Sequence, residues 1–241
     1  MPIDYETKKG SYPEVKEAIA VFVWDEILAK EKNPQIWIDA GTSAEEVAAV
    51  IAMKWQELKH APTVVTNNLG AWERIKTQEG SENLDIYLVG GRYNRVLNAM
   101  IELRSYEDSL KRWHPNIVVI AVSGINDQQL YCSNVQDESP VKRALATKSV
   151  EKRIIIADHT KIGRTDFGGF LELNEVGNDA EEVYLVTNRY AVSGFKEPIR
   201  REKYERTIAA FKTRGHVCEV PVDFVVETRA PGKPRKDSRK S

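Results

Sequence analysis

The segment 36-IWIDAGTSAEEVAAVIAMKWQEL-58 decides the fold class of this chain. It opens with the apolar run Ile36 to Ile38, which is typical of a buried strand, and turns at Gly41 into a helical pattern over residues 44–58. In that pattern apolar residues recur every three or four positions, which predicts one buried helix face. A strand that leads through a short glycine turn into an amphipathic helix is the repeating unit of α/β proteins.

Short apolar runs at five later places predict further strands of the same sheet. They lie at residues 63–66, 85–89, 117–122, 153–157 and 182–187, and one or two last strands are expected within 217–228. The runs are almost continuously apolar, which is typical of parallel strands covered on both faces. Helices are expected at 140–150, with Pro140 in the first turn, and at 199–214. The sequence therefore predicts an α/β fold, with a Rossmann-like, mostly parallel sheet and helices on both faces.

Three parts are expected along the chain. Residues 1–35 are an N-terminal helical extension, whose helix at 13–32 has an apolar face that packs on the body. Residues 36–228 are the α/β ligand-binding domain. Residues 229–241 contain two prolines, one glycine and six Lys or Arg, which predicts a basic disordered tail. A tail that binds nucleic acid or a protein partner is the alternative.

The composition is that of an ordinary globular protein and excludes several function classes. Of 241 residues, 41% are hydrophobic, and 35 Lys or Arg nearly balance 36 Asp or Glu, so net charge does not indicate nucleic acid or an anionic membrane as a partner. The N-terminus has no signal-peptide pattern, and no apolar run approaches the roughly 20 residues of a membrane span. Cys132 and Cys218 lie far apart and the four histidines are scattered, so neither a metal site nor a cofactor is expected. We expect a cytoplasmic protein with reduced thiols.

The turn after the first strand has the features of a phosphate site. Gly41 permits a tight turn and a close backbone approach, and Thr42 and Ser43 supply hydroxyl groups at the start of a helix. Free backbone N–H groups and the positive end of the helix dipole favour an anion there. The alternative is simple capping of the helix by Thr42 or Ser43, since acidic residues follow them.

Polar residues also follow the later strands, and each has a structural alternative as a turn, a helix start or an ordinary surface lysine. They are Thr66 and Asn67, then Gly90, Gly91 and Arg92, then Ser123, Gly124 and Asn126, and finally Lys161, with Glu138 and Lys142 in a helix between the last two groups. Arg92 is a candidate to bind an anion through two parallel hydrogen bonds. The carboxyl ends of parallel strands meet at one edge of a sheet, where open α/β proteins bind ligands. We therefore expect these residues to surround one ligand site together with Asp39.

The order of these motifs resembles a known family. Asp39-Ala40-Gly41-Thr42-Ser43, Val65-Thr66-Asn67-Asn68, Val89-Gly90-Gly91, Ser123-Gly124-Ile125-Asn126, Glu138 with Val141-Lys142-Arg143-Ala144, and Ala157-Asp158-His159-Thr160-Lys161-Ile162-Gly163 are similar to the C-terminal effector-binding domain of DeoR-family regulators. That domain belongs to the group containing ribose-5-phosphate isomerase, glucosamine-6-phosphate deaminase and CoA transferases.

The resemblance implies a sugar-phosphate pocket and assigns roles to its residues. Gly41, Thr42 and Ser43 would hold the phosphate; Asp39, Thr66, Asn67 and Gly91 would shape the sugar site; Glu138, Lys142 and Lys161 would supply charges. Only about 35 residues precede the first strand, where the family has a winged helix-turn-helix, so direct DNA binding is not expected.

Two classes of function follow from these observations. The first is a free-standing sensor domain for a phosphorylated small molecule, with a sugar phosphate as the expected ligand. It is expected to have no membrane partner and to report occupancy to a regulatory protein or across its own homo-oligomer. The second is an aldose–ketose phosphate isomerase, or a related lyase or deaminase, with Glu138 as base and Lys142 or Lys161 stabilising an enediolate. Asp39 is the reserve base. A nucleotide-derived ligand suits the same phosphate site.

Overall fold

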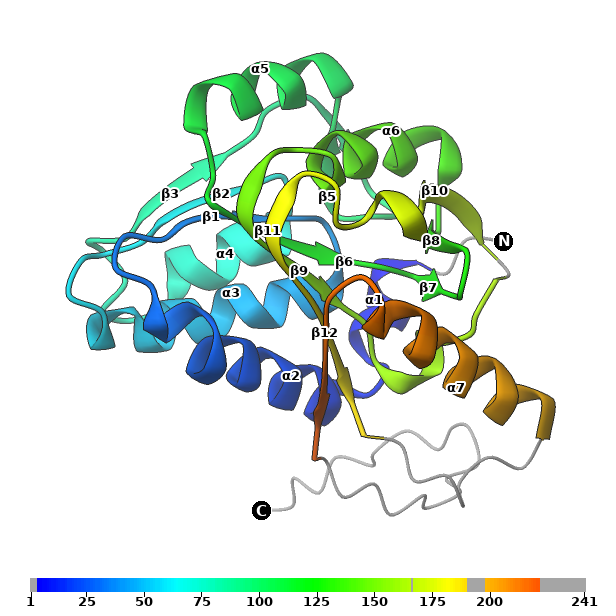
Figure 1. Cartoon of the computed structure of the whole chain (residues 1–241). Coiled ribbons are helices and arrows are strands. Elements are labelled where there is room, and N and C mark those ends of the chain that lie inside the picture. The colour runs from blue at the N-terminus through cyan, green and yellow to red at the C-terminus, as the bar shows by residue number, and fades with distance from the viewer. Residues whose placement is uncertain (1–3, 166, 190–197, 222–241) are drawn as a thin grey trace, which may run out of the picture.

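A seven-stranded parallel sheet forms the centre of the computed structural model, which describes residues 4–165, 167–189 and 198–221 (Figure 1). Every neighbouring pair of its strands is parallel, which confirms the predicted α/β class. In spatial order the strands are β12 (His216–Val220), β11 (Ala180–Asn188), β9 (Val150–Ile156), β6 (Ile117–Ala121), β1 (Gln35–Ile38), β2 (Thr63–Thr66) and β3 (Asp85–Leu88).

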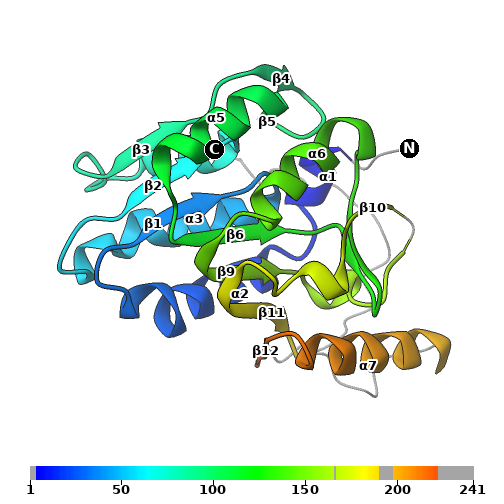
Figure 2. The same cartoon turned by 45° about the horizontal axis from the view of Figure 1, so that its top comes forward.

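Helices cover both faces of this sheet, as predicted (Figure 2). One face carries α2 (Pro13–Glu26), α3 (Thr42–Lys54) and α4 (Leu69–Thr77), and the other carries α5 (Leu103–Trp113), α6 (Val135–Ala146) and α7 (Pro198–Lys212). Successive residues of a strand point to opposite faces. Accordingly, Trp37 packs in the core under α5, α6 and α7, whereas Ile36 and Ile38 pack in the core under α2, α3 and α4.

Short helices, 3-10 turns and two small antiparallel sheets surround the central sheet. A first helix, α1 (Tyr5–Lys9), precedes α2, and the described ranges contain the 3-10 turns η1 (Leu28–Lys30), η2 (Trp55–Glu57), η3 (His159–Lys161) and η4 (Leu173–Glu175). β4 (Arg92–Asn94) and β5 (Ala99–Ile101) form an antiparallel hairpin. β7 (Gly124–Ile125), β8 (Gln129–Cys132) and β10 (Gly168–Glu172) form a small antiparallel sheet that continues from the end of β6.

The direction of winding reverses between β1 and β6. From β1 the chain moves outward through β2 to β3, then returns to β6 and continues through β9 and β11 to β12. Such a reversal separates the loops that follow the two central strands, and it opens a crevice at their carboxyl ends. The sheet order alone therefore places a ligand crevice beside Gly41 and Ser123, the loops after β1 and β6.

Two predicted helices have wrong boundaries: α6 covers Val135–Ala146 instead of 140–150, and the helix predicted over 13–32 is shorter. The helix expected to start at Pro140 starts at Val135, because the Asn134 side chain accepts a hydrogen bond from the backbone N–H of Asp137 at 3.3 Å and caps it there. Pro140 thus lies inside α6. The helix expected over 13–32 ends at Glu26 and continues as η1. Residues 222–228 of the last predicted strand segment and the tail at 229–241 lie outside the described residues.

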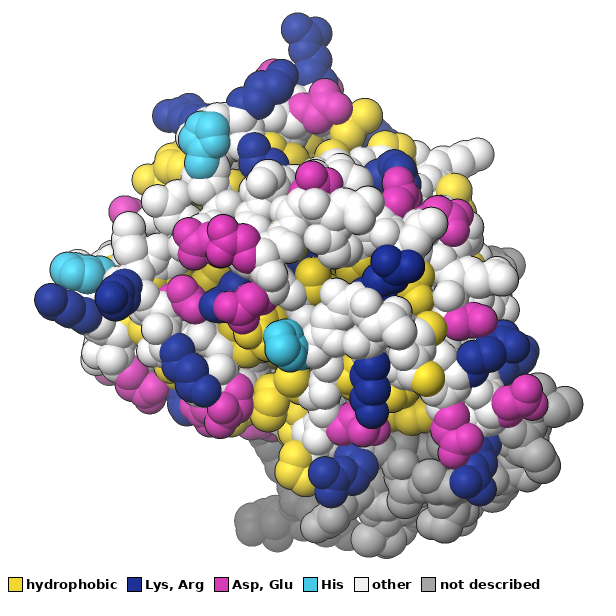
Figure 3. Space-filling model, viewed as in Figure 1, with side chains coloured by type: hydrophobic (Ala, Val, Ile, Leu, Met, Phe, Trp, Pro, Cys, Tyr) yellow, Lys and Arg dark blue, Asp and Glu magenta, His cyan; other side chains and the backbone are white. Residues whose placement is uncertain are grey.

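Acidic and basic side chains are interspersed over the face seen in Figure 3, in line with the balanced composition. None of the helices in the described ranges has the length and apolar content needed to cross a bilayer.

Candidate functional site

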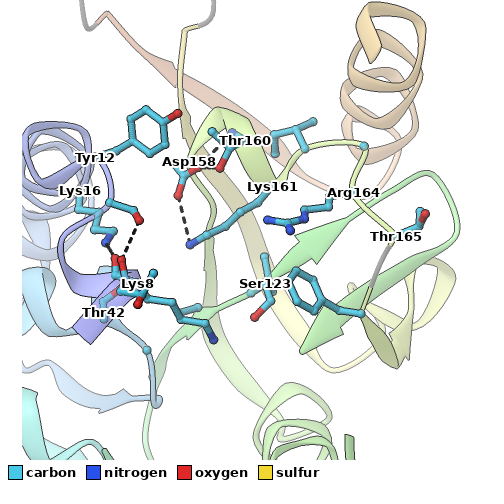
Figure 4. Close-up of a pocket in the computed structure, with 18 of the residues that line it drawn as sticks. Lys8, Tyr12, Lys16, Thr42, Ser123, Asp158, Thr160, Lys161, Arg164 and Thr165 are labelled. Carbon is cyan, nitrogen blue, oxygen red and sulfur yellow. Dashed lines mark hydrogen bonds and ion pairs between the residues drawn. The ribbon is translucent and has the colours of Figure 1, made fainter. Parts of the chain in front are cut away.

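A cavity of about 720 Å³ opens where β1, β6 and β9 end (Figure 4). Its walls come from the loops after these strands, from α1 and the start of α2 on one side, and from α7 on the other. Its volume lies within the roughly 300–1,000 Å³ typical of small-molecule sites. The cavity therefore occupies the crevice that the strand order creates.

The start of α3 forms one wall and is open to an anion. Gly41 is the N-cap residue of α3, and it has no side chain with which to cap the helix. Thr42 and Ser43 are already inside the helix and make no capping hydrogen bond, so the capping alternative does not describe this turn. Gly41 and Thr42 line the cavity. The N-terminal N–H groups and the helix dipole of α3 are thus available to a negatively charged group.

Gly41 is required by the geometry of this turn. Its φ of 144° and ψ of 148° fall in a region that is essentially confined to glycine. A Cβ atom placed on it would lie 2.7 Å from the Cβ of Ala121, at the end of β6. The absence of a side chain therefore lets the β1 and β6 loops approach each other at the cavity.

Lys161 brings a positive charge to the same turn. It lies in η3 after β9, and its Nζ is 3.4 Å from Ser43 Oγ and 3.3 Å from Asp158 Oδ2. Burial tends to raise the pKa of Asp158, but Lys161 and hydrogen bonding with Thr160 lower it overall, so this carboxylate is charged. The dashed contacts in Figure 4 show how Asp158 holds Lys161 and Thr160 in place.

The N-terminal segment supplies two more lysines that the sequence reading missed. Lys8 of α1 and Lys16 of α2 both line the cavity, with Tyr12 between them. Lys16 is 3% exposed and donates to the backbone carbonyl of Lys8. Burial, together with the nearby charge of Lys161, lowers the pKa of Lys16 to about 8. Lys8 donates to Ser133 Oγ at 2.6 Å, and burial lowers its pKa as well.

A buried network fixes α1 against the start of α3. The Tyr5 hydroxyl donates to Glu45 Oε2 at 2.5 Å, and Lys9 Nζ lies 2.8 Å from Glu45 Oε1. Gly70 of α4 packs on this pair, because a Cβ there would lie 2.4 Å from Glu45 Oε2 and 2.7 Å from the Tyr5 hydroxyl. The network holds Lys8 at the cavity. No sequence periodicity indicates it, since α1 is only five residues long.

Glu138 and Lys142, the predicted catalytic pair, make contacts within the protein that hold the loops around the cavity. Lys142 is 1% exposed and does not line the cavity; its Nζ contacts Asp39 Oδ2 and lies 3.1 Å from Ala40 O and 2.7 Å from Ala121 O. These contacts use all three of its donors. Although burial opposes it, Asp39 and Glu138 raise the pKa of Lys142 and keep it charged. Burial raises the pKa of Asp39 to about 6, against the influence of Lys142.

Glu138 lines the cavity, but its carboxylate is already engaged. Its Oε2 accepts hydrogen bonds from Ser133 N, Ser133 Oγ and Asn134 N at 3.1–3.2 Å, and its Oε1 is 3.4 Å from Lys142 Nζ. Asp39 Oδ1, by contrast, has no hydrogen-bond partner among the described residues. Asp39 is fully buried and does not line the cavity.

Several other predicted residues, Ser43 among them, do not line the cavity. Thr66 donates to Ile38 O at 2.7 Å, Asn67 donates to Met100 O at 3.0 Å, and both are buried. Asn126 accepts from Gln128 N and Gln129 N, at 2.9 and 2.7 Å, and shapes the β7–β8 turn. Ser123 does line the cavity. Gly124 lies beside the wall: a Cβ there would be 2.6 Å from the carbonyl oxygen of Arg164.

The glycine pair after β3 does not line the cavity. Gly90 and Gly91 are exposed, and Arg92 Nη2 forms an ion pair with Asp137 Oδ1 at 2.6 Å. β3 is the outer strand, two positions from β1 in the sheet. At about 4.8 Å per strand, its end lies roughly 10 Å away from the β1 turn.

The chain is similar to known proteins of one family. A family model described as the DeoR C terminal sensor domain matches residues 12–178. The chain is similar to the HTH-type transcriptional repressor GlcR of Bacillus subtilis, at 28% identity over 143 residues, which are 59% of this chain and 51% of that protein. It is also similar to the Lactose phosphotransferase system repressor of Staphylococcus aureus, at 25% identity over 146 residues, 61% of this chain and 54% of that protein.

The chain thus spans about half the length of these curated relatives. Among solved structures, it is similar to ribose 5-phosphate isomerase A from Methanocaldococcus jannaschii, at 10% identity and a TM-score of 0.43, covering 63% of this chain and 55% of that one. The family model covers more than half of the chain, and the chain therefore belongs to the family of DeoR C-terminal sensor domains.

Proposed function

We propose that this chain senses a phosphorylated small molecule, with a sugar phosphate as the ligand class. One observation carries the proposal: the uncapped start of α3 at Gly41 faces a cavity into which Lys161, Lys16 and Lys8 bring positive charge. Backbone N–H groups at a helix start, joined by lysines and hydroxyls, form a site suited to a phosphate group. The Ser123 hydroxyl lines the same cavity and can accept from or donate to a sugar hydroxyl.

The arrangement of Glu138 and Lys142 supports sensing over isomerisation. An isomerase needs a carboxylate that is free to take a proton and a cation that touches the substrate. Here Glu138 accepts three hydrogen bonds from its own helix start, and Lys142 is buried behind the cavity wall. The names of the two relatives, both repressors, support a regulatory use of ligand binding. We infer that a homo-oligomer or a regulatory protein reads the occupied state.

Thermal unfolding against a panel of sugar phosphates, nucleotides and unphosphorylated sugars tests this function. A ligand at about 100 times its Kd adds about 2.7 kcal/mol to the free energy of unfolding. We expect stabilisation by phosphorylated sugars alone, with each compound recovered unchanged. Turnover of a compound that stabilises the protein would make the chain an enzyme, and the absence of any shift would contradict the sensor function.

A variant pair locates the phosphate. Thr42→Val with Ser43→Ala removes both hydroxyls at the start of α3 while keeping their volumes, and we expect it to abolish ligand stabilisation without unfolding the chain. Thr77→Val is the matched control, since this exposed hydroxyl bonds only to Glu73 O at 2.7 Å. Undiminished binding by the double variant would show that the phosphate lies elsewhere.

A further inference from the structure

One side of the cavity is formed by the N-terminal segment, by which we mean residues 4–12: α1, its N-cap and the turn that joins it to α2. Thr7, Lys8, Ser11 and Tyr12 of this segment line the cavity. Because α1 has only five residues, it is not stable as a helix in water by itself. The position of the N-terminal segment therefore depends on its contacts with the rest of the protein.

The N-terminal segment contacts three elements that surround the cavity: the first turn of α3, the loop between β8 and α6, and η3. These elements are far apart in the sequence, so the segment bridges loops that no local interaction holds together. The contacts join Tyr5 and Lys9 to Glu45, Lys8 to Ser133, and the ring of Tyr12 edge-on to the ring of His159.

Positive charges repel one another where this segment meets the start of α3. Within the described ranges Lys8 and Lys16 form no ion pair, whereas Lys161 pairs with Asp158. Burial is the main cause of the lowered pKa of Lys8 and of Lys16, and the charge of Lys161 lowers both further. Glu138 near Lys8 and Asp158 near Lys16 offset only part of this effect, since both pKa values stay lowered. Without an anion, the repulsion therefore acts against the docked position of α1, which carries Lys8.

Lys16 connects this charge directly to α1. Its ammonium group donates to the backbone carbonyls of Lys8 and Lys9, the second at 3.5 Å, and these are the last two residues of α1. An ammonium group has three donors, so one remains for an anion. Figure 4 shows Lys161 pointing toward the side of the cavity where Lys8 and Lys16 lie. An anion between Lys16 and Lys161 would thus reduce the repulsion and fix the group that holds the end of α1.

The turn between α1 and α2 is strained at Tyr12. Its φ of 50° and ψ of 51° lie in the left-handed region, which residues other than glycine, asparagine and aspartate rarely adopt. Such a conformation persists only where surrounding contacts fix it. Release of α1 would relieve this strain, so the docked position is favoured only as long as its contacts hold.

We propose that the phosphate group of the ligand locks the N-terminal segment onto the cavity, and that this docking of α1 is the change by which the chain reports occupancy. The inference rests on the proposed function and adds the regulation of the same site. The bound anion offsets the repulsion among Lys8, Lys16 and Lys161, so the docked position of α1 is more stable with ligand than without it. Such coupling is reciprocal: a change that loosens α1 must also weaken ligand binding.

Hydrogen–deuterium exchange of the full chain, measured by mass spectrometry, follows the docking of α1. The amides of Lys8, Gly10 and Ser11 donate to carbonyls within the N-terminal segment, so their exchange reports its opening. The probes are inorganic phosphate and glucose 6-phosphate, against sodium chloride at equal ionic strength, and thermal unfolding registers which probe binds. We expect a bound probe to slow exchange in residues 4–12 by about fivefold or more. The β4–β5 hairpin, which does not line the cavity, is the internal control and should change by less than about twofold.

Tyr5→Phe tests the reciprocal effect. It changes no charge and lies outside the cavity lining, but it removes a hydrogen bond that holds α1 on Glu45. We expect faster exchange in the N-terminal segment without ligand, and an affinity for the bound probe that is weaker by about fivefold in titration calorimetry. Tyr93→Phe is the matched control, because this hydroxyl donates to Asn98 Oδ1 at 3.2 Å in the exposed hairpin. Its affinity should stay within about twofold of the parent protein.

The outcomes separate the two proposals. A probe that binds without slowing exchange in residues 4–12 would overturn the docking inference and leave the sensor function standing. Faster exchange in Tyr5→Phe with unchanged affinity would overturn it as well. Failure of every phosphorylated compound to bind would overturn both proposals.

Discussion

Replacement of Gly41 by alanine tests whether the β1 turn has the geometry described above. The backbone at this position has φ 144° and ψ 148°, and the added Cβ would lie 2.7 Å from Ala121 Cβ. Two costs therefore combine: backbone strain in a region confined to glycine, and overlap with the end of β6.

The magnitude follows from these two costs. A residue held in such a backbone region costs about 1–3 kcal/mol, and overpacking by one methyl group costs about another 1–3 kcal/mol. We expect Gly41→Ala to lower the free energy of unfolding by about 2–6 kcal/mol. Gly90→Ala is the control, because no atom lies within 4 Å of the added Cβ and its φ is not positive; we expect a change within about 1 kcal/mol.

Urea unfolding followed by circular dichroism measures both variants. The second substitution Ala121→Gly separates the two costs, since it removes the overlapping methyl group but leaves the backbone strain. In the Gly41→Ala background, Ala121→Gly should change the free energy of unfolding more favourably than it does in the parent protein. We expect this difference to be about 1–3 kcal/mol. Equal stability losses for Gly41→Ala and Gly90→Ala, or no coupling between positions 41 and 121, would refute the reasoning.

Three further predictions concern the lysines and the N-terminal helix. The affinity for a phosphorylated sugar should fall as pH rises from about 8 toward 10, because Lys16 in the free protein has a pKa of about 8 and loses its proton over this range, whereas a bound anion favours the charged form. Lys16→Gln should bind more weakly and lose affinity less steeply with pH, because Lys8, whose pKa burial also lowers, remains in the cavity. A flat profile for the parent protein would contradict the assignment. Lys142→Met should lower the free energy of unfolding by about 3–5 kcal/mol, because it leaves Asp39 buried without its cation. Urea unfolding measures this loss, and adding Asp39→Asn should recover part of it. A loss below about 1 kcal/mol would contradict a supporting role for Lys142. Tyr5→Phe should lower the free energy of unfolding by about 1.5 kcal/mol, because it removes a hydrogen bond to the Glu45 carboxylate. It should also weaken ligand binding, because α1 is held less firmly against α3. Unchanged stability and affinity would show that the position of α1 does not depend on this contact.

The regular part of the architecture was predictable from local patterns. Continuous apolar runs predict buried parallel strands, and the run at Ile36–Ile38 with the glycine turn after it identifies the unit that the rest of the sheet repeats. Because parallel strands end at one edge, the sequence also predicted that Thr42, Ser123 and Lys161 would share a site. The structure brings the loops of all three to one cavity.

Sequence periodicity says nothing about which distant segments meet, and the tertiary structure decided those features of the site. Lys8 and Lys203 line the same cavity although 195 residues separate them, because α1 docks on α3 and α7 docks on the turn after η3. Arg92 belongs to a polar motif that follows β3, the outer strand of the sheet. The distance across the sheet between β3 and β1 therefore keeps Arg92 away from the cavity, and it pairs with Asp137 instead.

Sequence patterns also could not show the surroundings of Lys142, which its residue type and position suggested as a ligand contact. Only packing shows that its ammonium group is enclosed by Asp39 and two strand-end carbonyls. The sequence by itself thus determined the sheet, the edge at which the cavity opens and the glycine turn at Gly41, through local periodicity and backbone sterics. The tertiary structure alone decided which charges face the cavity, because that depends on contacts between segments far apart in the chain.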